Sequence, residues 1–268
     1  AMIKPPSSAS EQSSDTSEEQ TEGTTSSSDS SAGMDWSAAN TKNKKTQGSF
    51  TVCVDAGHQG SWVDMSAQEP MATTGTSGNF SNVPEYEVNL EVSLVLQKEL
   101  LSRGYNVIMT REDNDKAISN KERAELATEE GADITVRIHA NGANDSASAG
   151  ALTMAPTSSN QYLNQDIIEK SNTLATCIIN HYCDATGLGN LGVISSDNMT
   201  GTNWSTVPVA ILEMGFMSNQ KDDLYITDSS NHETMAKAVA DGIDEYFSLV
   251  SPAASEMPSP SPVEEPSE

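Results

Sequence analysis

The sequence predicts a single α/β domain whose parallel or mixed sheet carries helices on both faces. Short runs rich in β-branched residues alternate with longer segments of helical periodicity, which is the pattern of α/β proteins. Several runs are apolar throughout, as expected of strands buried on both faces. Ligand sites of open α/β sheets gather at the carboxyl ends of the strands, so metal-capable side chains there indicate a metal centre with a base beside it. Three runs lead to such a side chain: 50–54 before His58, 134–138 before His139, and 207–212 before Glu213.

Composition divides the 268 residues into three parts. Residues 1–47 form a Ser/Thr/Glu-rich linker, and residues 251–268 carry five prolines. Neither segment can bury enough apolar surface to offset the entropy lost on ordering, so both are predicted to be disordered. Residues 48–250 remain as one folded domain, which is long enough for a sizeable core.

The first elements of this domain are a strand, a loop, a helix and a second strand. The strand at 50–54 is followed by a long Gly/Ser/Thr-rich loop at 59–83. A helix is predicted over 87–102, because apolar residues recur there at helical spacing and Gly104 can end it. Residues 105–109 then form the next strand.

The middle of the domain repeats this alternation. A helix over 119–129 is predicted to begin at Ser119, because Glu122 three residues later completes a capping box. A strand at 133–138 follows, and residues 150–154 are expected to add another.

Helices dominate the last part of the domain. A long amphipathic helix over 163–185 is closed by Gly187. A short strand at 191–195 precedes the strand at 207–212, and the last helix runs from about 230 to 247.

Charge and cysteine content exclude several classes of function. The formal net charge is −25, and most of it lies within the folded domain. Such a domain is a poor partner for nucleic acid or for an anionic membrane surface, both of which attract clustered Lys and Arg. Cys53 lies in a strand, while Cys177 and Cys183 are too far apart along one helix for an unstrained disulfide. All three are predicted to belong to the core.

The chain carries no apolar window of the roughly 18 residues that a membrane span requires, and no signal-peptide core. A long polar lead-in is nevertheless unusual on a cytosolic enzyme. We therefore expect an export signal or membrane anchor to precede this sequence and the protein to act outside the cytoplasm.

The two strand-end histidines are the first candidate metal ligands. His58 lies in the segment VDAGHQG, where Gly57 and Gly60 allow a sharp exit from the strand. A phosphate-binding loop is a weak alternative, because no Lys-Ser/Thr pair and no helix follow. His139 lies in the segment RIHANG. Either histidine alone could have a purely structural role. Two histidines at strand ends, in a chain with only four histidines, favour a shared site. The remaining two, His181 and His232, are interpreted as surface residues of helices.

Two glutamates are the other candidates. Glu85 or Glu87 could complete a His₂Glu zinc set, or either could only favour a helix N-terminus. Glu213 lies among apolar residues that would desolvate it and raise its pKa, as a general base at neutral pH requires. The alternative for Glu213 is a structural salt bridge to Arg111 or Arg123.

Six stretches, in order, resemble the zinc-dependent N-acetylmuramoyl-L-alanine amidases of the amidase-3 type. The stretches are VDAGH at 54–58, EYEVNL at 85–90, GYNVIMTR at 104–111, ERAELA at 122–127, IHANG at 138–142 and VPVAILEMGFMSN at 207–219. The resemblance implies a twisted, mixed and mostly parallel sheet of about six strands with helices on both faces. It also implies that His58, Glu85 and His139 bind one zinc ion and that Glu213 is catalytic, and family spacing selects Glu85 over Glu87.

The function implied by the resemblance is hydrolysis of the amide between N-acetylmuramoyl residues and L-alanine in bacterial peptidoglycan. A zinc-activated water would attack, with Glu213 as the general base. The protein would act as a secreted or wall-anchored enzyme, as a monomer, without contact between the folded domain and nucleic acid or membrane. A zinc peptidase with another amide substrate, a non-catalytic wall-binding module and an acidic interaction domain without metal are the alternatives.

Two departures from the family pattern bear on the site. The loop at 59–83 is longer than the compact family version and could form an extra wall of the cleft. Arg137 stands two residues before His139, where a small Ser is common, and could affect the surroundings of the metal. The segment 143–165 is where an autoinhibitory plug could lie.

Overall fold

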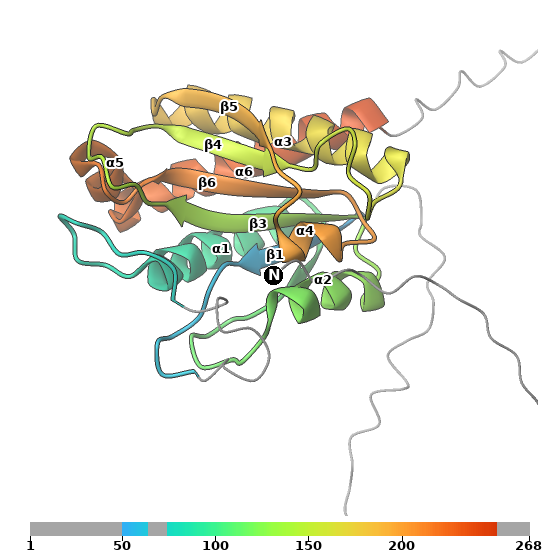
Figure 1. Cartoon of the computed structure of the whole chain (residues 1–268), viewed down its shortest axis with the longest axis horizontal. Coiled ribbons are helices and arrows are strands. Elements are labelled where there is room, and N and C mark those ends of the chain that lie inside the picture. Colours follow the sequence, from blue (N-terminus) through green and yellow to red (C-terminus); the bar gives the residue numbers. More distant parts are fainter. Residues whose placement is uncertain (1–49, 64–73, 251–268) are drawn as a thin grey trace, which may run out of the picture.

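A computed structural model describes residues 50–63 and 74–250 of the chain, which Figure 1 shows as ribbon. The terminal segments predicted to be disordered, 1–47 and 251–268, lie outside the described residues, so that prediction stays a prediction. Six strands and six helices are present in the described part. They are β1 (Thr51–Ala56), α1 (Glu85–Ser102), β2 (Asn106–Met109), α2 (Asn120–Glu129), β3 (Ile134–Asn141), β4 (Ala151–Ala155), α3 (Gln165–Thr186), β5 (Asn190–Ser195), α4 (Thr200–Asn203), β6 (Val209–Phe216), α5 (Gln220–Ile226) and α6 (Ser229–Val250).

The strands form one mixed sheet in the order β2-β1-β3-β6-β4-β5. β2, β1, β3 and β6 pair in parallel, β4 pairs with β6 in the antiparallel sense, and β5 is parallel to β4. The carboxyl ends of β1, β3 and β6 therefore lie at one edge of the sheet, where their following residues meet. The predicted six-stranded, mostly parallel mixed sheet is confirmed.

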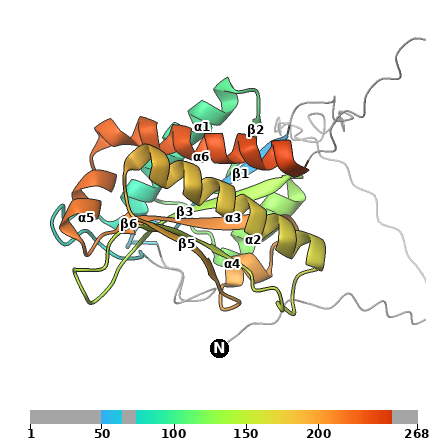
Figure 2. The ribbon, with the colours of Figure 1, turned by 90° about the horizontal axis from the view of Figure 1, so that it is seen from above.

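Helices cover both faces of the sheet, but unequally (Figures 1 and 2). α1, α6 and α3 lie side by side on one face, and the main hydrophobic core fills the space between them and the sheet. On the other face α2 and α4 cover one part, with a small cluster of Cys53, Ala127 and Ala132 beneath α2. The helices expected on both faces are confirmed.

Local signals in the sequence explain most element boundaries. Ser119 and Glu122 form the predicted capping box at the start of α2, and Gly187 ends α3 with φ +70°. α4 and α5 were not anticipated, because helices of four and seven residues are too short to show a helical period. No helix in the described ranges is long and apolar enough to cross a membrane.

Candidate metal centre and active site

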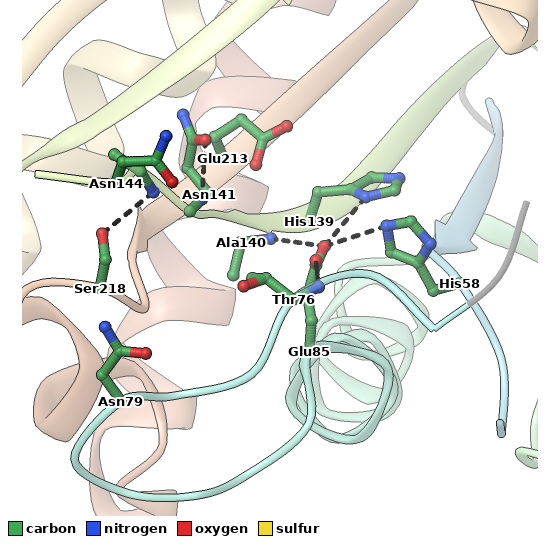
Figure 3. A pocket seen from close by; sticks show the side chains of 12 residues that line it. His58, Thr76, Asn79, Glu85, His139, Ala140, Asn141, Asn144, Glu213 and Ser218 are labelled. Atoms are coloured by element: carbon green, nitrogen blue, oxygen red, sulfur yellow. Dashed lines mark hydrogen bonds and ion pairs between the residues drawn. The ribbon is translucent and has the colours of Figure 1, made fainter. Parts of the chain in front are cut away.

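Two histidines and one glutamate from three different elements face one another at the carboxyl edge of the sheet (Figure 3). His58 follows β1, Glu85 begins α1, and His139 lies on β3. Their candidate ligand atoms all lie within 4.8 Å of one another. Glu85 Oε1 lies 3.3 Å from His58 Nε2 and 3.2 Å from His139 Nδ1. The structure thus brings together the three residues that the sequence singles out as ligands.

Backbone amides and one side chain hold the Glu85 carboxylate in place. Oε1 accepts hydrogen bonds from the Ala140 amide (3.1 Å) and from Asn89 Nδ2 (3.2 Å), and Oε2 accepts one from the Thr76 amide (2.9 Å). Glu87, the local rival, is only half-buried and lies outside the cluster. Of the two glutamates, only Glu85 therefore lies in the candidate metal cluster.

The turn after β1 places His58, but not in the way the glycines suggested. The left-handed residue is His58 itself, with φ +61°. Gly57 has a different role, because a Cβ there would lie 2.3 Å from atoms of the His139 ring. The expectation that Gly57 and Gly60 make the sharp exit is therefore wrong: Gly57 leaves room for the second histidine. A left-handed histidine costs about 1–2 kcal/mol, so other contacts must hold it.

Two buried arginines supply those contacts. Arg111 donates to the carbonyls of Ala56 (2.8 Å) and Gly57 (3.0 Å), and Arg123 donates to the carbonyls of Ala56 (2.7 Å) and His58 (2.9 Å). Both guanidinium groups are thus used to fix the turn that presents His58. Neither arginine forms a salt bridge with Glu213. The structural alternative for that glutamate is therefore wrong.

Glu213 lies on β6 directly opposite His139 on β3, and Figure 3 shows it beside the cluster. The register between the two strands shifts just beyond this pair, between His139 and Asn141, as a β-bulge does near many active sites. Burial and the nearby Glu85 carboxylate together raise the pKa of Glu213 to about 8, although Arg137 opposes the rise. A carboxyl group with such a pKa can take up and release a proton near neutral pH.

Two groups of the cluster, His139 and Glu85, have the protonation states that a metal site needs. Burial lowers the pKa of His139 to about 4, although its hydrogen bond with Glu85 opposes that shift, so the imidazole is neutral at pH 7. Burial alone would raise the pKa of Glu85, but the hydrogen bonds with His139 and His58 outweigh it and lower the pKa well below the usual range. A neutral imidazole and an ionised carboxylate are the forms that bind a divalent cation.

The cluster opens into a polar cavity of about 660 Å³. Thr76 and Asn79 line it, so the described part of the loop 59–83 does form a wall of the cleft, while residues 64–73 lie outside the described residues. The segment 143–165 holds β4 between two loops and no helix before α3 begins, so no helical plug lies there. The structure adds to the site residues that the sequence reasoning missed: Asn79, Asn141, Asn144 and Ser218.

Comparison with known proteins identifies the family. Residues 52–245 match the family described as N-acetylmuramoyl-L-alanine amidase. The chain belongs to this family. It is a hydrolase that cleaves the amide bond between N-acetylmuramoyl residues and L-alanine in peptidoglycan.

Curated and solved relatives agree with this assignment. The probable cell wall amidase LytH of Staphylococcus epidermidis is 29% identical over 198 residues, covering 74% of this chain and 58% of LytH. The catalytic domain of the amidase CwlV from Bacillus (Paenibacillus) polymyxa superposes with a TM-score of 0.62 at 27% identity, covering 75% of this chain and 99% of CwlV. The CwlD amidase of Clostridioides difficile, solved in complex with the GerS lipoprotein, gives a TM-score of 0.62 at 26% identity, covering 75% of this chain and 99% of CwlD.

Arg137, which stands where the family resemblance predicts a small Ser, has defined contacts in the structure. Arg137 Nε donates to Asp55 Oδ2 at 2.6 Å and Nη2 donates to Asn120 Oδ1 at 2.7 Å, both in buried or partly buried positions. Asp55 also pairs with Arg123 at 2.5 Å through its other oxygen. Burial would raise the pKa of Asp55, but the two arginines and Thr110 lower it far below the usual range. One carboxylate therefore pairs with two buried guanidinium groups.

Replacing Asp55 with asparagine should destabilise the amidase by about 3–5 kcal/mol, because both buried arginines would lose their anion. Urea unfolding measures the effect as a lower midpoint at an unchanged slope. Asp166→Asn is the matched control: this aspartate pairs with Lys170 but its side chain is 69% exposed, so the change should stay within about 0.5 kcal/mol. A loss below about 1 kcal/mol for Asp55→Asn would show that the network is not a stabilising one.

The other histidines and the cysteines have structural roles. His181 is exposed and lies 3.1 Å from Glu245, as expected of a surface residue. The prediction for His232 is wrong: it is buried, with Nε2 2.9 Å from the carbonyl of Ile226, because α5 packs across the first turn of α6. Cys53, Cys177 and Cys183 are buried and free, which confirms their assignment to the core.

Proposed function

We propose that this amidase works with one zinc ion held by His58, Glu85 and His139, and with Glu213 as the general base. The convergence of the three donor groups, with Glu213 on the adjacent strand of the same cavity, is the observation that carries the proposal. Peptidoglycan is the substrate, and the place of action is outside the cytoplasm, at the cell wall. That the domain is a monomer stays a prediction.

The donor set fits zinc. Two imidazole nitrogens and one carboxylate are a standard set for catalytic zinc and leave a fourth position open for water or substrate. Ligands about 2.0–2.1 Å from a tetrahedral zinc ion lie roughly 3.3 Å from one another. The two separations from Glu85 Oε1, 3.3 Å to His58 and 3.2 Å to His139, agree with that spacing.

The chemistry divides between the ion and the side chains. When bound, zinc would polarise the scissile carbonyl and lower the pKa of a coordinated water toward about 7. Glu213 would accept a proton from the attacking water and pass it to the departing amine of L-alanine as the C–N bond breaks. Glu85, fixed by the amides of Thr76 and Ala140, keeps the two imidazoles oriented.

Digestion of purified peptidoglycan with and without a chelator tests the proposal. New L-alanine amino termini, read by mass spectrometry, should appear without chelator, disappear with it and return when zinc is added. Equal release in the presence of the chelator would exclude a metal-dependent reaction. Termini other than L-alanine would instead favour the alternative of a zinc peptidase.

A further inference from the structure

A second cavity of about 760 Å³ continues the groove of the candidate active site. The two cavities share neighbouring residues on the same chain segments: Asn79 and Ser218 line the first, and Phe80 and Asn219 line the second. In Figure 3, Asn79 and Ser218 lie on the other side of Glu85 from His58, so the residues next to them in the chain place the second cavity on the side away from His58.

Hydrogen bonds between the loops fix the shape of the second cavity. The amides of Phe80 and Ser81 donate to Asp223 Oδ2 at 2.8 and 2.9 Å, which ties the loop after Gly75 to α5. On the opposite wall, Asn219 Nδ2 donates to the carbonyl of Ser146 at 2.8 Å. Both walls are therefore hydrogen-bonded to the segment that follows Glu213. These bonds define the shape of the second cavity beside the first.

The lining of the second cavity combines apolar surface with one cation. Phe80 is 44% exposed and Leu224 is 48% exposed, and Tyr225 lies beside them in the same cavity. Lys221 is the only lysine or arginine among the described residues that line either cavity. Among the described lysines, Lys121, Lys170 and Lys237 each pair with a glutamate or aspartate. Lys98, Lys116 and Lys221 form no such pair with a described residue, and of these three only Lys221 lines one of the two cavities.

A lysine that forms no ion pair and lines a cavity next to the candidate active site, in so acidic a chain, indicates an anionic ligand. The substrate of the proposed function supplies one, because the peptide that begins at the scissile L-alanine ends in a free carboxylate. Neutral sugar rings offer no charge for Lys221. We propose that the second cavity binds the peptide portion of the substrate, with Lys221 pairing a carboxylate beyond L-alanine and Phe80 and Leu224 supporting the apolar atoms. This inference rests on the proposed function.

Kinetics on two soluble muropeptides test it: one with free carboxylates in its peptide, and the same compound with those carboxylates converted to amides. Lys221→Gln should raise KM for the first substrate by roughly 3- to 5-fold and Lys221→Glu by more, with kcat within about twofold, because an exposed ion pair contributes uniform binding. Neither variant should affect KM for the amidated substrate. Lys170→Gln, an exposed lysine on α3, is the control and should leave both substrates unaffected.

Phe80→Ala provides a second variant that does not depend on charge. It should raise KM for both substrates alike, because it removes apolar contact with the peptide. An unchanged KM in the Lys221 variants, or equal rises for the free and amidated substrates, would overturn the role of Lys221. Wild-type turnover separates the two levels of inference: an inactive wild type overturns the proposed function together with this inference, whereas an active wild type with unaffected variants overturns this inference alone.

Discussion

Replacing Glu213 with glutamine should abolish turnover while zinc binding persists. Glutamine keeps the size of the side chain but cannot accept a proton, and general-base catalysis contributes about 10²–10⁴-fold in rate. The loss should fall on kcat for a soluble muropeptide. Glu213 lies on β6, outside the cluster of His58, Glu85 and His139, so the zinc content of the purified variant should match that of the wild type.

Glu87→Gln is the matched control for this experiment. Glu87 is the other glutamate close to the site in sequence, is only half-buried and lies outside the candidate metal cluster. Its variant should retain kcat within about twofold, because the Glu87 side chain contacts neither the reacting atoms nor the candidate metal ligands. A Glu213→Gln protein with near-native kcat would remove Glu213 from the mechanism and leave the proton acceptor to be sought among the other residues of the cavity.

Replacing His58 or His139 with alanine should remove both zinc and activity. Each variant would leave two protein ligands where catalytic zinc typically takes three. The zinc content should fall from about one ion per chain to a small fraction, and kcat/KM should fall by more than about 10²-fold. A second readout is independent of turnover: added zinc should raise the melting temperature of the wild type but not of the variants, because only a bound ion stabilises the folded state.

His181→Ala separates ligand loss from the general effect of losing a histidine. His181 is exposed on α3 and pairs only with Glu245, so its variant should keep zinc, activity and the zinc-dependent rise in melting temperature. Full zinc occupancy in His58→Ala or His139→Ala would contradict the assignment of that histidine as a ligand.

Two buried arginines hold the turn that carries His58. Arg111 and Arg123 are both buried, and each donates hydrogen bonds to backbone carbonyls of residues 56–58. Hydrogen bonds from charged donors to backbone carbonyls are stronger than those from neutral donors. Such bonds can stabilise a turn whose central histidine has a left-handed backbone conformation. Preorganisation of this kind lets binding energy be spent on the substrate rather than on ordering the loop.

Much of the candidate site could be predicted from sequence because its residues sit at strand ends. His58, His139 and Glu213 each follow or end an apolar run, and parallel strands carry such positions to one edge of the sheet. Glu85 was harder, because a glutamate at the start of a helix has an ordinary electrostatic role and Glu87 shares its surroundings. There the family resemblance, and then the hydrogen bonds to the amides of Thr76 and Ala140, made the choice.

The sequence by itself determined the local order of this protein: where strands and helices alternate, how α2 begins and how α3 ends, and which side chains leave the strands. Those features depend on periodicity and capping, which are properties of neighbouring residues. Only the tertiary structure decided that His58 is left-handed, that His232 is buried, that Asp55 pairs with two arginines and that Lys221 lies in a second cavity. Each of these depends on contacts between residues far apart in the chain, whose partners are fixed by strand register and helix packing rather than by local pattern.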